Sequence, residues 1–157
     1  MMLIRLTYFS RNRLDRRYGS VPNGINEILA TSVANNRRDG ITGALICDDR
    51  WFAQVLEGLE TKVSATFERI LRDQRHGDVS LVTMQAVAER LYGDFAMLAI
   101  FRGKDNSDLF RHYAEDEAFD PRQMRADRLS DLIEEVVRRH VTGGQQPWTT
   151  RSATSAA

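Results

Sequence analysis

The sequence has almost no cysteine, and it has no long run of apolar residues. Its single cysteine, Cys47, excludes an internal disulfide bond, and its place in an apolar run predicts a buried, reduced thiol. It contains no stretch of about 18 consecutive apolar residues that would cross a membrane. Residues 1–7 lack the basic start and apolar stretch of a signal peptide. These absences predict a soluble, cytoplasmic protein with no membrane partner.

The sequence also lacks an excess of charge of either sign. Its 22 Lys and Arg residues balance its 22 Asp and Glu residues, whereas a nucleic-acid module usually carries a basic surplus or stripe. The three histidines, His76, His112 and His140, are far apart and show no metal-ligand spacing. A G-x-S-x-G nucleophile motif and a P-loop are both missing. We therefore expect neither a nucleic-acid partner nor a metal site.

The length of 157 residues fits one domain with a short appendage. Five stretches show either the apolar–polar alternation or the short apolar run that is typical of a strand. The polar gap at residues 48–50 predicts a hairpin between two of them, and Gly93 marks a turn between two others. The five predicted strands are residues 3–9, 41–47, 51–56, 80–88 and 95–102.

Two stretches between these strands have helical spacing. Pro22 suits the first turn of the first helix, and residues 36–40 carry the Asn and Gly that favour its end. Thr61 is the expected N-cap of the second helix. The order β-α-β-β-α-β-β predicts an α+β, ferredoxin-like sheet with two helices on one face. The expected buried positions are Ile25, Ile28, Leu29 and Val33 in the first helix, and Val63, Phe67, Ile70 and Leu71 in the second.

Beyond residue 102 the pattern becomes helical. Residues 107–115 predict a short helix, and Asp120-Pro121 predicts the start of a longer one that ends at Gly143-Gly144. An apolar stripe along the longer helix must pack either on the outer face of the sheet or on a second copy of the chain. We divide the chain into a domain of residues 1–102, a C-terminal helical extension of residues 103–141 and a disordered tail of residues 142–157. The stripe consists of Leu129, Leu132, Ile133, Val136 and Val137.

Three polar residues do not fit a plain apolar core. Strand alternation places Gln54 on the same face as Phe52 and Leu56, where an unpaired buried amide costs about 1–3 kcal/mol. Tyr8, on the inward face of the first strand, also needs a partner and would come within reach of Gln54. The alternatives are a backbone or water partner for Gln54 and a helix C-cap role for Asn36. Together the three residues predict a pocket suited to a flat polar heterocycle.

Six short segments occur in a characteristic order along about two thirds of the chain. They are LIRLTY at 3–8, Asn35-Asn36, GITGAL at 40–45, FAQVLEG at 52–58, RDQRH at 72–76 and FAM at 95–97. This ordered set resembles the BLUF domain, a flavin-binding blue-light sensor. The fold expected from periodicity agrees with the ferredoxin-like fold of that family.

The resemblance implies an FAD-type cofactor, with FMN as the alternative, held between the two helices with its ring over the sheet. Tyr8 would be the light-driven electron and proton donor, and Gln54 would lie between Tyr8 and the flavin N5/O4 edge. Asn36 would bond the C4 carbonyl and N3 side of the ring, and Met97 would pass the change to the last strand. The remaining implied contacts are Ile25 and Ile28 along the ring, and Arg69, Arg75 and His76 along the phosphate-bearing tail, although each of these last three also suits a solvated helix surface.

A glutamine suits such a switch because its amide carries both donors and acceptors. Rotating or tautomerising Gln54 would exchange one hydrogen-bond pattern for another and shift the flavin absorption to the red. No covalent adduct is required, so Cys47 need not take part. One position departs from the family: many members carry Trp where this chain has Phe95. Phe donates no hydrogen bond, so we expect no switching scheme that depends on a tryptophan.

We therefore expect a short, stand-alone blue-light photoreceptor that is not an enzyme. Its output would run through the C-terminal helices, through a homo-oligomer or through an unidentified downstream protein partner. The alternatives are an acylphosphatase-like hydrolase and a non-photoactive binding module on the same fold. The hydrolase would need an anion-binding loop after the first strand, where residues 10–13 (SRNR) offer arginine but no glycine. The basic group Arg11, Arg13, Arg16 and Arg17 is either solvated or in contact with phosphates.

Overall fold

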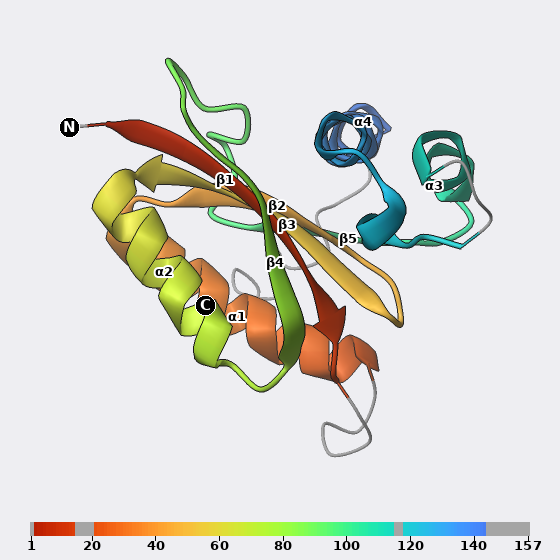
Figure 1. Cartoon of the computed structure of the whole chain (residues 1–157), viewed down its shortest axis with the longest axis horizontal. Coiled ribbons are helices and arrows are strands. Elements are labelled where there is room, and N and C mark those ends of the chain that lie inside the picture. The colour runs from red at the N-terminus through yellow and green to blue at the C-terminus, as the bar shows by residue number, and fades with distance from the viewer. Residues whose placement is uncertain (1, 15–20, 115–117, 144–157) are drawn as a thin grey trace.

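The computed structural model describes residues 2–14, 21–114 and 118–143. Strands and helices follow one another in the order predicted from the sequence, and further helices come after the last strand (Figure 1). The elements are β1 (Leu3–Asn12), α1 (Val21–Asp39), β2 (Thr42–Cys47), β3 (Trp51–Leu59), α2 (Glu60–Arg72), β4 (His76–Ala86), β5 (Leu98–Phe101), α3 (Ser107–Ala114), the 3₁₀ turn η2 (Pro121–Gln123) and α4 (Ala126–Thr142).

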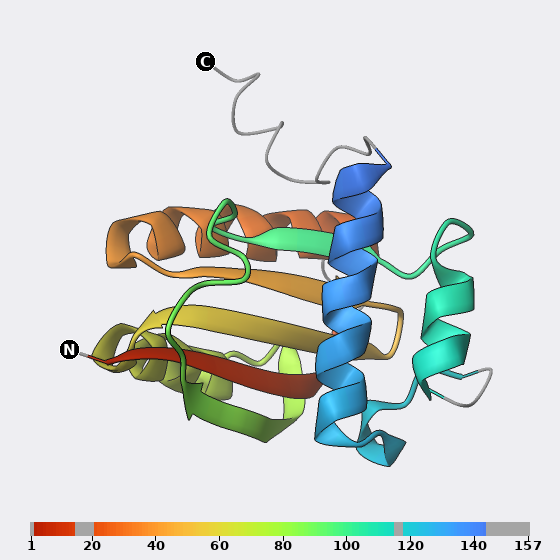
Figure 2. The same cartoon turned by 90° about the horizontal axis from the view of Figure 1, so that it is seen from above.

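The five strands form one mixed sheet in the order β4-β1-β3-β2-β5. β1 pairs antiparallel with both β3 and β4, β2 pairs antiparallel with β3, and β5 runs parallel to β2 at the edge. Helices α1 and α2 cover one face of the sheet (Figure 1), and α4 crosses the strands on the opposite face (Figure 2). The predicted α+β, ferredoxin-like fold with two helices on one face is confirmed.

The core between the sheet and helices α1 and α2, called here the helix-side core, follows from the alternation of β1. Ile4, Leu6 and Tyr8 point into it and are buried. α1 adds a buried face, and α2 contributes Val63. The first helix ends where expected, because Gly40 adopts the left-handed conformation (φ 68°) that glycine tolerates best.

The opposite face of the sheet packs against α4 and forms the α4-side core. The whole apolar stripe of α4, Leu129, Leu132, Ile133, Val136 and Val137, is buried there. Its sheet partners include Val55 of β3 and Ile46 of β2. The predicted packing on the outer face of the sheet is therefore confirmed, and the alternative of a dimer built on this stripe is wrong because the chain itself covers it.

Several predicted boundaries were wrong. α2 begins at Glu60 after Leu59, so Thr61 lies in the first turn and does not cap the helix. Leu71, expected on the buried face, is 52% exposed because α2 turns this position away from the sheet. Asp120-Pro121 opens only the short turn η2, where Asp120 accepts a hydrogen bond from the Arg122 amide, and α4 starts at Ala126.

The strand limits also differ from those predicted. β1 continues to Asn12 because its last residues pair with β3 and β4, so most of the expected SRNR loop is strand. Arg11, near the end of β1, contacts Asp78 of β4 (Nε–Oδ2 3.1 Å). β4 begins at His76, and β5 is limited to four residues. Residues 15–20, with Arg16 and Arg17, and the predicted tail from 144 onward lie outside the described residues.

Two further observations concern the described part of the chain. No helix in it has the length and apolarity needed to cross a membrane. Nor does it contain a group of three or more His, Cys, Asp or Glu side chains placed to hold a metal ion.

Candidate functional site

Tyr8 and Gln54 lie directly opposite each other on β1 and β3. The Tyr8 hydroxyl donates a hydrogen bond to the Oε1 atom of Gln54. Tyr8 is fully buried and Gln54 is 6% exposed. Burial raises the pKa of the Tyr8 hydroxyl, and the negative charge of Asp73 adds to the effect. The phenol therefore stays protonated at neutral pH and keeps its role as donor.

The other end of the Gln54 amide is also satisfied. Its Nε2 group donates to the sulfur of Met97 at 3.3 Å, and Met97 is itself fully buried. Among the described residues, the two ends of the Gln54 amide thus meet a phenol and a thioether, both of them side chains. A thioether sulfur accepts hydrogen bonds only weakly and donates none. The environment of Gln54 therefore favours this orientation of the amide without holding it strongly.

Asn36, in the last turn of α1, reaches the same short segment as Gln54. Its Nδ2 group donates to the backbone oxygen of Ala96 at 2.7 Å, and the side chain is buried. Its backbone oxygen accepts from the Ile41 amide at 2.9 Å, as expected at the end of a helix. Both readings of Asn36 made from the sequence therefore describe it: the backbone ends the helix, and the side chain joins the polar cluster around Gln54.

A cavity of about 180 Å³ lies between α1, α2 and the sheet. Gln54, Asn36 and Met97 line it, with Ile28 and Leu56 among its apolar walls. The arrangement combines apolar walls with a few convergent polar groups, as in sites for flat cofactors. The full lining is Ile28, Leu29, Thr31, Ser32, Asn35, Asn36, Leu45, Gln54, Leu56, Thr66, Arg69, Ile70, Asp73, Arg75, His76 and Met97.

Seven of the nine residues predicted for the site therefore belong to the lining. The other two are Tyr8, which contacts the cavity through Gln54, and Ile25, which is buried in the helix-side core. Sequence reasoning missed the polar residues Thr31, Ser32, Thr66 and Asp73. For Ser32 a signal was present, because it lies four residues before Asn36 and so shares its helix face. The residues brought together are Ile28, Asn36, Gln54, Arg69, Arg75, His76 and Met97.

His76 contributes a neutral imidazole to the cavity. It is the first residue of β4, 9% exposed, and its Nδ1 atom lies 2.8 Å from the Ser10 hydroxyl. Its ring packs against Phe52 with centroids 4.9 Å apart. Burial lowers the pKa of His76 to about 4, with Arg75 adding to the effect and Asp73 opposing it. His76 is therefore uncharged at neutral pH, and the helix-surface alternative for it is wrong because it is a buried strand residue.

The two arginines of the lining are each held by a carboxylate. Arg69 on α2 donates to Asp39 at 3.3 Å and to the Thr66 hydroxyl at 3.0 Å. Arg75, just before β4, pairs with Asp73 (Nη2–Oδ2 2.6 Å). Partial burial would raise the pKa of Asp73, but hydrogen bonds from Arg75 outweigh it, so this pKa is lowered. These carboxylates fix the position of both guanidinium groups at the cavity wall.

Residues 95–97 divide between the two faces of the sheet. Met97 is buried in the helix-side core, whereas Phe95 packs against the α4-side core. Phe95, which stands where many BLUF members have Trp, therefore belongs to the α4 side in this structure. Cys47 is fully buried, as predicted, and burial raises the pKa of its thiol.

Comparison with known proteins gives a consistent result. The model of a family described as "Sensors of blue-light using FAD" matches residues 3–98. The photoactivated adenylate cyclase subunit alpha of Euglena gracilis is 35% identical over 96 residues, which are 58% of this chain and 8% of that protein. Subunit beta from the same organism is 35% identical over 95 residues, or 57% of this chain and 10% of that protein. The chain thus spans about a tenth of these relatives' length.

Solved structures show the same likeness over most of the chain. A structure described as "BlsA photo-activated state" superposes with a TM-score of 0.77 at 26% identity, covering 87% of this chain and 95% of that one. The dark-state structure of BlrB, described as a BLUF protein, gives a TM-score of 0.67 at 27% identity, covering 86% of this chain and 97% of that one. In contrast to the cyclases, both of these chains are covered almost completely.

Proposed function

This chain belongs to the BLUF family of blue-light flavin photoreceptors, and from that premise we propose that Tyr8 and Gln54 form its light switch. The observation that carries the proposal is the hydrogen bond from the Tyr8 hydroxyl to Gln54, with Met97 on the far side of the same amide. Gln54 and Met97 line the cavity between α1 and α2, and Tyr8 reaches it through its bond to Gln54. The Tyr8–Gln54 hydrogen bond connects a phenol, which can lose a proton, with an amide, which can exchange its donor and acceptor ends.

The cavity suits the flavin ring by the chemistry of its donors. Asn36 and Gln54 supply amide groups to the polar edge of a heterocycle, and the neutral His76 adds an imidazole without charge. Ile28 and Leu56 offer apolar surface to the ring faces. We propose FAD as the flavin, with Arg69 and Arg75 holding the phosphate-bearing tail, because Arg combines charge with several fixed donors.

A bound oxidised flavin supplies, on absorbing blue light, an oxidant strong enough to take an electron from a phenol. Tyr8 is placed to give up that electron together with its hydroxyl proton, which already points at Gln54 Oε1. Because its pKa is raised, the phenol holds this proton until the electron leaves. Gln54 then rotates or tautomerises, so that the groups facing Tyr8 and Met97 are exchanged. Once the electron and proton have returned to Tyr8, the exchanged hydrogen-bond pattern of Gln54 would remain and would shift the absorption of a flavin held in the cavity to the red.

We propose that the output is conformational and involves no catalysis by this chain. Met97 immediately precedes β5, and β5 contributes Leu98 and Ile100 to the α4-side core. A change at Met97 therefore has a short route to α4. In this proposal residues 1–102 sense light and residues 103–141 pass the signal to a second copy or to a protein partner. The relatives whose names include adenylate cyclase suggest that BLUF domains serve different outputs.

The proposal is tested by an absorption spectrum of the purified, flavin-loaded protein, in the dark and directly after blue light. We expect a flavin band that moves slightly to the red and returns in darkness. A protein that binds no flavin, or whose bound flavin shows no reversible shift, would contradict the proposal.

A further inference from the structure

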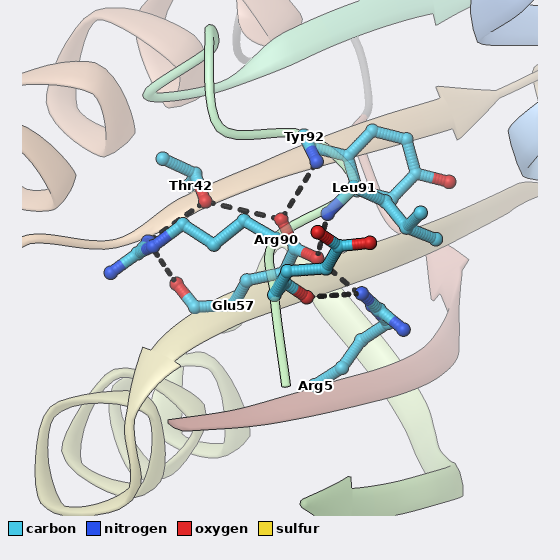
Figure 3. A network of polar contacts seen from close by, with 7 residues as sticks. Arg5, Thr42, Glu57, Arg90, Leu91 and Tyr92 are labelled. Carbon is cyan, nitrogen blue, oxygen red and sulfur yellow. Dashed lines mark hydrogen bonds and ion pairs between the residues drawn. The ribbon is translucent and has the colours of Figure 1, made fainter. Parts of the chain in front are cut away.

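A buried carboxylate lies on β3 only three residues from the light switch. Glu57 is fully buried, and its two oxygens accept four hydrogen bonds (Figure 3). Oε2 accepts from Arg5 Nε at 2.9 Å and from the Leu91 amide at 2.8 Å. Oε1 accepts from the Tyr92 amide at 2.9 Å and from the Thr42 hydroxyl at 3.2 Å. A buried carboxylate of this kind is stable because every acceptor direction has a donor.

The partners of Glu57 have two origins. Arg5 and Thr42 are its cross-strand neighbours on β1 and β2, so they belong to the rigid sheet. Leu91 and Tyr92 belong to the segment between β4 and β5, which has left the strand ladder and needs other acceptors for its amides. Glu57 therefore fastens this segment to the sheet through the backbone, independently of the segment's side chains.

Arginine side chains reinforce the same attachment. Arg90, from the segment, donates to the Thr42 hydroxyl at 2.9 Å and to the Glu57 backbone oxygen at 3.1 Å (Figure 3). It also donates to the Gly40 backbone oxygen at 2.8 Å. Arg5 donates to the backbone oxygen of Glu89 at 3.0 Å. We call residues 89–92, held in this way, the anchored segment.

The anchored segment leads directly to the light switch. The Phe95 amide donates to the Tyr92 oxygen at 3.0 Å, and the Phe95 oxygen accepts from the Gly43 amide at 3.1 Å. The next two residues are Ala96 and Met97, which accept from Asn36 and Gln54. Only four residues separate Tyr92 from Met97, so the position of the Met97 sulfur depends on where the anchored segment is held.

Gln54 and Glu57 therefore contact the same β4–β5 connection from opposite faces of β3. Gln54 faces the helix-side core, and Glu57, an odd number of residues away, faces the other side. Tyr92, anchored by Glu57, is 4% exposed and packs in the α4-side core. We propose that Glu57 is a positioning residue of the light switch: by anchoring residues 89–92 it holds Met97 against Gln54 and so favours the resting orientation of that amide. This inference rests on the proposed function.

The direction of the effect follows from the sulfur. In the present orientation Gln54 Nε2 has Met97 as an acceptor, but in the exchanged orientation Oε1 would face a sulfur that has no hydrogen to donate. Holding Met97 in place therefore disfavours the exchanged orientation. If Met97 is held less firmly, the resting orientation of the Gln54 amide is no longer preferred. The red-shifted state then persists longer in the dark.

The experiment measures the lifetime of the red-shifted state of the full, flavin-loaded chain after a blue flash. In Glu57→Gln an amide NH₂ group takes the place of one carboxylate oxygen, so one of the two backbone N–H groups, Leu91 or Tyr92, loses its acceptor. We expect the lifetime to lengthen by about threefold or more. Met97→Leu, which removes the acceptor, should lengthen it similarly. The double variant should show no more than the larger single effect, because both changes act through one contact. The exposed Glu68→Gln on α2 is the matched control and should keep the wild-type lifetime.

The outcomes separate the inference from the proposed function. An unchanged lifetime in Glu57→Gln, or effects of Glu57→Gln and Met97→Leu that simply multiply, would overturn the role of Glu57 while leaving the photoreceptor in place. Loss of the red shift in the wild type would instead contradict the proposed function itself. If Glu57→Gln does not fold, Thr42→Val serves in its place. It removes one donor to Glu57 and one acceptor of Arg90, and it leaves Arg5, Leu91 and Tyr92 bound to Glu57. It should lengthen the lifetime about twofold, and no change would again overturn the inference.

Discussion

The Tyr8 hydroxyl donates its hydrogen bond to Oε1 of Gln54 directly across the β1–β3 ladder. Antiparallel pairing brings directly opposed side chains to within reach of one another on one face. The donor is a phenol whose pKa is raised by burial, and the acceptor is an amide whose other end faces a sulfur. In this geometry Tyr8 is the hydrogen-bond donor and Gln54 is the amide that can exchange its two ends. Substituting each residue alone tests the two roles separately.

Replacing Tyr8 with phenylalanine removes the hydroxyl that we propose as the electron and proton donor, but keeps the ring that packs in the helix-side core. We expect Tyr8→Phe to bind flavin and to lose the reversible red shift, as measured by difference spectra after blue light. Tyr92→Phe serves as control, since this second buried tyrosine packs in the α4-side core. A normal light-induced shift in Tyr8→Phe would remove Tyr8 from the mechanism.

Replacing Gln54 with alanine removes the amide and leaves both Tyr8 and Met97 without this partner. We expect Gln54→Ala to retain bound flavin, with flavin fluorescence in the dark, and to show no red shift on illumination. Asn35→Ala is a matched control, because Asn35 supplies another amide to the cavity lining and has no place in the Tyr8–Met97 chain. If Gln54→Ala still shifts to the red, the amide is not the switch.

His76 makes stability depend on pH. Burial lowers its pKa from 6.5 to about 4, so the unfolded chain takes up a proton below pH 6.5 while the folded chain does not. The free energy of unfolding should therefore fall as the pH drops from 6.5 to 4, by roughly 3 kcal/mol from this residue, and by no more below that range. Urea titrations at several pH values measure this decrease.

The comparison variant for this pH effect is His76→Gln, which should be less stable at neutral pH but should lose that part of the pH dependence. His112→Gln, at an exposed position on α3, should keep it. An equally steep decrease in wild type and in His76→Gln would show that other groups cause it.

The α4 stripe contributes to stability within one chain. Leu132 is fully buried in the α4-side core, so Leu132→Ala should lower the free energy of unfolding by about 2–5 kcal/mol. Because the stripe packs on the sheet of its own chain, the size of the particle in solution should not change. Denaturant titration and light scattering measure the two effects. Asp131→Ala, on the exposed side of the same helix, should change stability by less than about 0.5 kcal/mol.

Local pattern identified most of the helices and strands but few of their ends. Alternation along residues 3–9 was enough to place Ile4, Leu6 and Tyr8 on one face, because strand geometry requires it. The end of β1 was missed because Ser10, Arg11 and Asn12 are strand residues only through their pairing with β3 and β4. The start of α2 was missed for a similar reason, since the Glu60 amide is satisfied by the distant Met2 oxygen and by no local cap.

The sequence by itself determined the order of elements, the apolar stripe of α4 and the pairing of Tyr8 with Gln54, because these depend on periodicity and on the alternation of neighbouring strands. It gave no sign that Glu57 would anchor residues 89–92, and it did not reveal the polar contributions of Thr66 and Asp73 to the cavity. Those relations join residues that are distant along the chain. They exist only because packing the helices and the β4–β5 connection on the sheet leaves buried polar groups that must find partners.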